Sequence, residues 1–306
     1  MNKIKTVAAF GAAYYGWSTL MPSKIKSIEG RTVLVTGAAS GLGRVLALEL
    51  AQRATGVVLL LDINEIELEE TKQRVLKLFP KAIVKTFVCN LASRVDIARC
   101  TEEIKQQHHV EILINNAGVV TGKPLLSTSD EKNELTMQIN ALAHIYLSKA
   151  FLPDMITNKF GHICGVGSVA GLLGAAGMVD YSASKFAARG FYEALSLELF
   201  EQGIRSVNVS CVCPTLIDTG LFDGFYVPLN PTLKTIDVAR GVIWAIEHNW
   251  ELLVMPSWLQ LTTLFLKSIF NVNGSIGIKT PFASPMKDWN DSKSQQTFHM
   301  IQNSKL

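Results

Sequence analysis

Short apolar runs and longer segments of mixed polarity alternate along residues 31–256. The runs have the length of strands and are almost wholly apolar, which is typical of parallel strands covered on both faces. They predict strands at Thr32–Thr36, Val57–Leu61, Ala82–Cys89, Ile112–Ile114, Phe160–Val166, Ser206–Val212 and Leu252–Val254. The intervening segments predict helices at Leu42–Ala54, Ile63–Leu78, Ser93–His108, Leu135–Phe151, Tyr181–Gln202 and Thr235–His248. Strands alternating with helices favour an α/β fold with a parallel sheet.

The composition allows a large buried core and gives no sign of a nucleic-acid partner. The 306 residues carry a net charge of +3, with no block of basic residues in the central part of the chain. Apolar residues make up 48% and charged ones 18%. The mean hydropathy of +0.23 is high for a soluble enzyme and indicates contact with lipid or with an apolar ligand.

The cysteines and histidines show no metal or redox spacing. The cysteines are Cys89, Cys100, Cys164, Cys211 and Cys213. The last two share a face of one predicted strand, but neighbours along a strand are poorly placed to bridge. We therefore expect buried, reduced thiols in a non-oxidising compartment. The six histidines are scattered along the chain, so no metal site is predicted.

A glycine-rich turn, TGAASGLG at residues 36–43, joins the first predicted strand to the first helix. This is the context that a phosphate-binding loop needs, because glycine lets the backbone approach a pyrophosphate and the helix supplies N–H groups. The candidate binding positions are Gly37, Ser40, Gly41, Leu42 and Gly43.

Asp62 ends the second predicted strand, about twenty residues after the turn, where a carboxylate binds the ribose hydroxyl of NAD and repels the 2′-phosphate of NADP. No Arg follows Asp62 directly, and Ser40 rather than a basic residue stands in the turn. The sequence therefore favours NAD over NADP. The alternative is that Asp62 only caps the helix that follows it.

Tyr181 and Lys185 lie on one face of a predicted helix, since residues four apart point the same way. An ammonium group beside a phenol favours the phenolate and lowers the pKa of the phenol from about 10. A tyrosine tuned in this way can exchange a proton with a substrate oxygen near neutral pH. Ser168 stands upstream in a Gly/Ser loop and can offer a second hydroxyl to the same oxygen. An ordinary pair on an exposed helix is the alternative.

Four features in this order resemble the short-chain dehydrogenase/reductase family: the TGxxxGxG turn, the NNAG of residues 115–118, Ser168, and the YxxxK pair. The resemblance covers about residues 30–256. It implies a Rossmann-type doubly wound three-layer sandwich, with a parallel sheet of about seven strands in the order 3-2-1-4-5-6-7. It also implies that a nicotinamide cofactor lies across the carboxyl ends of the strands.

The resemblance assigns roles to further residues. Asn140 matches the family's fourth catalytic residue, whose main chain holds a water that links Lys185 to solvent. Further cofactor contacts are implied at Asn90, Leu91, Asn116, Ala117, Gly118, Pro214 and Thr219. Two positions depart from the family pattern. Asn90 replaces the usual Asp beside the adenine, so we expect a weakened contact there, and Thr215 replaces the Gly after Pro214.

The reaction implied by the resemblance is hydride transfer between NAD and an alcohol or carbonyl. Ser168 holds the substrate oxygen, and Tyr181 accepts the hydroxyl proton in oxidation or donates it in reduction. Lys185 lowers the pKa of Tyr181 and holds the nicotinamide ribose.

The two ends of the chain differ from the central domain, which we expect to span residues 31–256. In residues 1–30, the uncharged Val7–Met21 would form a helix of about 22 Å, shorter than the ~30 Å hydrocarbon core of a bilayer. We favour an anchor that lies in the membrane interface; a true span and a helix docked on the protein are alternatives. In residues 257–306, the apolar Trp258–Phe270 is either a second membrane-facing helix or a wall of the substrate site. The chain ends in Ser304-Lys305-Leu306, the peroxisomal address tripeptide.

The apolar ends resemble the membrane- and lipid-droplet-associated subgroup that includes 17β-hydroxysteroid and epidermal-type retinol dehydrogenases. This resemblance implies a lipophilic substrate: a steroid, a retinoid or a long-chain alcohol. Leu172, Leu173 and Met178 are candidate substrate contacts, with ordinary loop packing as the alternative, and Leu221–Leu233 is a candidate apolar lid.

Several alternatives stay open from sequence. Asp62 favours oxidation, but an NADP-dependent lipid carbonyl reductase or a largely non-catalytic lipid-surface scaffold with the same fold is also compatible with the chain. The location is a membrane of the endoplasmic reticulum or lipid-droplet type, or the peroxisome. The family pattern implies a homodimer formed by Leu135–Phe151 and Tyr181–Gln202.

Overall fold

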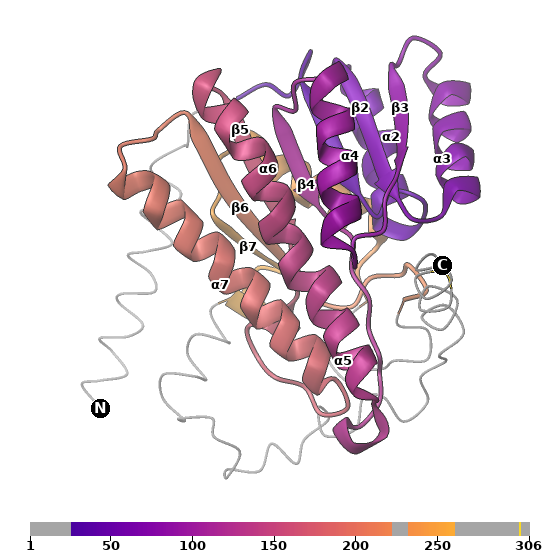
Figure 1. The fold of residues 1–306 in the computed structure, drawn as a ribbon, viewed down its shortest axis with the longest axis vertical. Coiled ribbons are helices and arrows are strands. Elements are labelled where there is room, and N and C mark those ends of the chain that lie inside the picture. The colour runs from indigo at the N-terminus through magenta and orange to yellow at the C-terminus, as the bar shows by residue number, and fades with distance from the viewer. Residues whose placement is uncertain (1–25, 222–231, 261–299, 301–306) are drawn as a thin grey trace.

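The computed structural model describes residues 26–221, 232–260 and 300 of the chain (Figure 1). Seven parallel strands form one sheet in the order β3-β2-β1-β4-β5-β6-β7, which confirms the predicted order. The strands are β1 Thr32–Thr36, β2 Val57–Asp62, β3 Val84–Val88, β4 Ile112–Asn115, β5 Gly161–Val166, β6 Val207–Pro214 and β7 Leu252–Met255. Because β1 pairs with both β2 and β4, the strand order reverses there and opens a crevice at the carboxyl ends.

Helices cover both faces of the sheet and give the predicted three layers. One face carries α2 Gly41–Gln52, α3 Glu65–Leu78 and α8 Thr235–Glu247. The other carries α4 Arg94–Gln107, α6 Ala143–Thr157 and α7 Val179–Glu201, with α5 Asp130–Met137 beside α7 (Figure 1). The short helical turns are η1 Leu125–Ser127, η2 Gln138–Leu142 and η3 Val169–Gly171.

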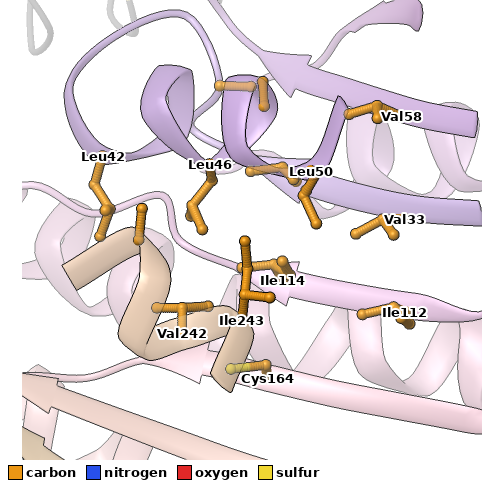
Figure 2. Close-up of a cluster of buried hydrophobic side chains, with 14 of the residues drawn as sticks. Val33, Leu42, Leu46, Leu50, Val58, Ile112, Ile114, Cys164, Val242 and Ile243 are labelled. Carbon is orange, nitrogen blue, oxygen red and sulfur yellow. The ribbon is translucent and has the colours of Figure 1, made fainter. Parts of the chain in front are cut away.

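The apolar strands supply both cores, because successive side chains point to opposite faces of the sheet. Val33 and Ile112, which are register partners on β1 and β4, face the α2–α8 side, whereas Leu34 and Leu113 face the α4–α7 side. Figure 2 shows the first core, where leucines of α2 and the side chains of α8 gather over the sheet: Leu42, Leu46, Leu50, Val242 and Ile243. Each fully buried side chain of this kind contributes about 1.5–3 kcal/mol to folding.

The predicted single helix at Leu135–Phe151 is wrong in its start, in its end and in its regularity, since α6 continues to Thr157. The helical region begins at Asp130, where Asp130 and Glu131 place negative charge at the positive helix end. The π-helical turn η2 then interrupts it between α5 and α6. A π-turn inserts an extra residue into a helix and often occurs at a functional site, and this one carries Asn140.

Several predicted segments lie outside the described residues. They are Val7–Met21, residues 222–231 of the predicted lid, residues 261–270 of the second apolar segment, and Ser304–Leu306. Within the described part of the chain, no helix combines the length and the apolar character needed to cross a membrane. The expectations for these segments stay predictions.

Candidate active site

A cavity of about 430 Å³ lies at the carboxyl ends of the strands, where the sheet order reverses. Its wall is built from the glycine turn, the loops that follow the strands, and α7. The predicted site residues that line it are Gly37, Ser40, Gly41, Leu42, Asp62, Asn90, Leu91, Asn116, Ala117, Gly118, Ser168, Tyr181, Lys185, Pro214 and Thr219. Two further predicted residues, Gly43 and Asn140, are not part of the wall.

Two glycines of the turn are packed so tightly that a side chain does not fit at either position. Gly37 has a φ of +66°, and a Cβ there would lie 2.8 Å from the Cα of Ala117. A Cβ on Gly43 would lie 2.0 Å from the carbonyl oxygen of Gly37. Gly43 therefore packs against the backbone of the turn and does not line the cavity, and its predicted cofactor contact stays a prediction.

Thr36 joins the glycine turn to the NNAG turn. Its Oγ1 accepts the backbone N–H of Asn116 at 2.9 Å and that of Ala117 at 3.0 Å. The side chain of Asn116 returns a hydrogen bond to the carbonyl oxygen of Thr36 at 2.8 Å. These bonds hold the end of β1 against the end of β4 at the cavity wall.

Asp62 ends β2 and organises the turn beside it. Its Oδ2 accepts the N–H of Ala39 at 3.0 Å, and its Oδ1 accepts the N–H of Asn64 at 3.0 Å. Burial raises the pKa of the Asp62 carboxyl. The N-cap of α3 is Asn64, whose Oδ1 accepts the N–H of Glu67 at 3.2 Å. The alternative in which Asp62 is the helix cap is therefore wrong.

The two departures from the family pattern both lie in the cavity wall. The Oδ1 of Asn90 accepts the N–H of Ala92 at 2.9 Å, so its side-chain acceptor already stabilises the turn after β3. Thr215 donates its N–H to the carbonyl oxygen of Met255 at 2.9 Å, which keeps this backbone tied to β7. The Thr215 hydroxyl has no hydrogen-bond partner among the described residues.

Ser168, Tyr181 and Lys185 meet in one part of the cavity. Ser168 follows β5, while Tyr181 stands in the first turn of α7 and packs with Val120 and Met178. Ser168 and Tyr181 share a side-chain hydrogen bond. The Nζ of Lys185 donates to the carbonyl oxygen of Val166 at 2.9 Å and lies 5.7 Å from the centre of the Tyr181 ring.

Burial controls the protonation of both groups. It raises the pKa of Tyr181 to about 12, although the hydrogen bond with Ser168 acts in the opposite direction. It lowers the pKa of Lys185 to about 8. The prediction that Lys185 brings the pKa of Tyr181 toward neutrality is wrong for this structure, because loss of water around the phenol outweighs favourable contacts.

Asn140 lies behind the cavity, and its side chain connects three segments. Its Oδ1 accepts the N–H of Val119 at 2.8 Å, and its Nδ2 donates to the carbonyl oxygen of Val119 at 2.9 Å and to Ser184 Oγ at 3.0 Å. Ser184 Oγ in turn donates to the carbonyl oxygen of Tyr181 at 2.7 Å. The side chain thus ties η2 to the segment after β4 and to α7. The water on its main chain stays a prediction.

The cysteines are buried and free, as predicted. The Sγ atoms of Cys211 and Cys213 lie 3.7 Å apart on one face of β6. A Cβ on Gly167 would lie 2.8 Å from Cys213 Sγ, so this thiol packs directly under the loop that carries Ser168.

The sequence predictions missed part of the cavity wall, and the candidate substrate contacts lie outside this wall. The additional wall residues are Ala39, Arg44, Ile63, Asn64, Glu67, Cys89, Val119, Ile139, Val166, Gly167, Ile217 and Met300. Two wall residues that the sequence had already singled out are Thr215, the departure after Pro214, and Leu221, the first residue of the candidate lid. Arg44 and Glu67 could have been predicted as wall residues, because Arg44 directly follows Gly43 and Glu67 lies five residues after Asp62. None of Leu172, Leu173 and Met178 lines this cavity; Leu172 packs in the core and Met178 against Tyr181.

A family model described as short chain dehydrogenase matches residues 31–226. The chain belongs to this family. It is therefore an oxidoreductase that acts on CH–OH groups with a nicotinamide cofactor.

Individual relatives agree with this assignment and with the predicted subgroup. The chain is 39% identical over 255 residues to epidermal retinol dehydrogenase 2 of Mus musculus, an alignment that covers 82% of each chain. It is also 39% identical over 252 residues to estradiol 17-beta-dehydrogenase 11 of Rattus norvegicus, covering 82% of this chain and 83% of that one. A short-chain dehydrogenase from Burkholderia phymatum, solved with NAD, superposes with a TM-score of 0.72 at 22% identity over 81% of this chain and 96% of its own, which confirms the fold.

The residues of the cavity fit a nicotinamide dinucleotide. Gly37 and Gly41 line the cavity without side chains, which leaves their backbone accessible to a ligand. A carboxylate stands at the end of β2, and an amine and two hydroxyls stand at the other end of the cavity. The unpartnered hydroxyl of Thr215 adds a polar group that a ligand can satisfy.

Proposed function

We propose that this protein transfers a hydride between NAD and a lipophilic secondary or allylic alcohol, or its carbonyl. The observation that carries the proposal is the meeting of Ser168, Tyr181 and Lys185 in the cavity that the glycine turn also lines. A steroid, a retinoid or a long-chain alcohol is the proposed substrate class. The names of the relatives, an estradiol and a retinol dehydrogenase, support this class.

The proposed cofactor site runs along the carboxyl ends of the strands. Residues 37–42 and the N-terminus of α2 hold the pyrophosphate, since N–H groups and the helix dipole favour anions there. Asp62 binds the adenosine ribose, and Asn90 and Leu91 lie beside the adenine. Asn116–Gly118, Lys185, Pro214 and Thr219 surround the nicotinamide riboside.

The protein side chains handle the proton of the reaction. When bound, the nicotinamide ring supplies the hydride acceptor or donor. Tyr181 holds a proton on its phenol oxygen and donates it to a substrate carbonyl; in alcohol oxidation the phenolate accepts it. Ser168 hydrogen-bonds the same substrate oxygen, and Lys185 binds the ribose close to that oxygen. Burial excludes water and strengthens each of these contacts.

We also propose a homodimer on a membrane or lipid-droplet surface. One stripe of α7 exposes four apolar side chains at helical spacing: Val179, Phe186, Leu197 and Phe200. Such a stripe is suited to packing against the same helix of a second copy. The apolar terminal segments supply the proposed membrane contact, and the terminal tripeptide the proposed peroxisomal address.

The test is the Tyr181→Phe variant of the full chain, assayed with NAD against estradiol, retinol and a long-chain alcohol. We expect kcat to fall by about 10²–10⁴-fold, because the proton donor and acceptor is lost, while NADH still binds by calorimetry. Tyr146→Phe, on α6 and outside the cavity wall, is the control. Undiminished turnover by Tyr181→Phe would refute the assignment, and the same screen with NADP tests the reductase alternative.

A further inference from the structure

Three charged side chains stand together at the Asp62 end of the cavity: Asp62, Arg44 and Glu67. Arg44 follows Gly43 on α2, and Glu67 lies in the first turn of α3. The two helices thus present opposite charges to each other beside the proposed ribose site. Arg44 and Lys185 are the only arginine or lysine side chains in the described cavity wall, and Lys185 lies at the Tyr181 end.

The guanidinium of Arg44 is held by three partners. Its Nε donates to Thr71 Oγ1 at 2.9 Å, and its Nη2 donates to the carbonyl oxygen of Ala39. The same Nη2 lies 3.4 Å from Glu67 Oε2. The side chain of Arg44 is only 19% exposed, whereas that of Glu67 is 45% exposed, so the guanidinium is more shielded from solvent than the carboxylate that contacts it.

This arrangement bears on the choice between NAD and NADP. A guanidinium is well suited to bind a phosphate, because its planar donors match the phosphate oxygens. Here the one cation at this end is engaged by a carboxylate, and a second carboxylate, Asp62, stands next to it. The three side chains sum to one negative charge, which repels the 2′-phosphate of NADP.

We propose that Glu67 is a specificity-determining residue that excludes NADP by engaging Arg44, in addition to the repulsion by Asp62. The inference rests on one part of the proposed function, namely that a nicotinamide dinucleotide binds with its adenosine ribose at Asp62. Removing the Glu67 charge leaves the Arg44 guanidinium bound to Thr71 and Ala39 beside the cavity but without its carboxylate partner, so its positive charge can act on the 2′-phosphate.

The test is calorimetric titration of the full chain with NADH and with NADPH, which requires no substrate. Glu67→Gln should lower the Kd for NADPH relative to that for NADH by about tenfold, since one charge close to the phosphate is removed. The double variant Arg44→Gln/Glu67→Gln should lose this gain. Glu65→Gln is the matched control, because Glu65 lies in the same first turn of α3 but outside the cavity wall.

Two results would overturn the inference. One is a Glu67→Gln variant whose NADPH to NADH affinity ratio stays within about twofold of the wild-type ratio. The other is a gain that persists without Arg44. If the wild-type protein binds neither nucleotide, the proposed function and this inference both fall; if it binds NADH and the ratio does not move, only this inference falls.

Discussion

Replacing Asn140 by Ala tests whether its side chain holds the site together. Asn140 is fully buried and makes three side-chain hydrogen bonds. The substitution removes them and leaves the buried N–H and carbonyl of Val119 without these partners. Each orphaned group costs about 1–3 kcal/mol, so we expect the free energy of unfolding to fall by about 3–5 kcal/mol. This is a large part of the ~5–15 kcal/mol of a typical domain.

The measurement is urea unfolding of the full chain, followed by tryptophan fluorescence, with Asn140→Ala compared with wild type. Gln106→Ala is the control, because Gln106 is an exposed residue on α4. A second readout is the affinity for NADH, which should weaken because Val119 lines the cavity. If the free energy of unfolding falls by less than about 1 kcal/mol, the Val119 backbone finds other partners, and the idea that the Asn140 side chain holds the site together is refuted.

Two further predictions follow from the site geometry. Gly43→Ala should weaken NADH binding by at least about 100-fold in calorimetry, because the added Cβ would lie 2.0 Å from the Gly37 carbonyl oxygen. Gly190→Ala is the control: a Cβ there has no atom within 4 Å, so this variant should bind NADH normally. The raised pKa of Tyr181, about 12, means that the phenol keeps its proton at neutral pH. The kcat/KM for alcohol oxidation should therefore rise steadily from about pH 7 to about pH 10 as phenolate forms, and a flat profile would contradict this.

The strands and the motif residues of the cavity wall could be predicted because both depend on local patterns. Each strand is a short apolar run, and the turn at residues 36–43 and the Tyr181–Lys185 pair keep a fixed spacing. The π-helical turn η2 had no such signal, since residues 138–142 contain neither Pro nor Gly. Within this turn, Asn140 makes hydrogen bonds with residues distant in the sequence, and no local pattern reveals such contacts.

Electrostatic properties were the least predictable. The pKa of Tyr181 depends on how completely Val120, Ala170 and Met178 enclose the ring, and these residues come from separate segments. The contact between Arg44 and Glu67 likewise depends on how α2 packs beside α3. The spacing of residues along the chain predicts which helix or strand carries a residue. How deeply that residue is buried, and which residue of another helix it contacts, depends on the tertiary fold.

The Thr36 hydroxyl has a consequence for engineering this protein. Because it accepts N–H groups from Asn116 and Ala117, the glycine turn and the NNAG turn are held together through one side chain. A transplanted glycine loop has to bring a matching partner loop with it, or both will lose their alignment. Substitutions at positions 36 and 116 should accordingly show strong epistasis rather than independent effects.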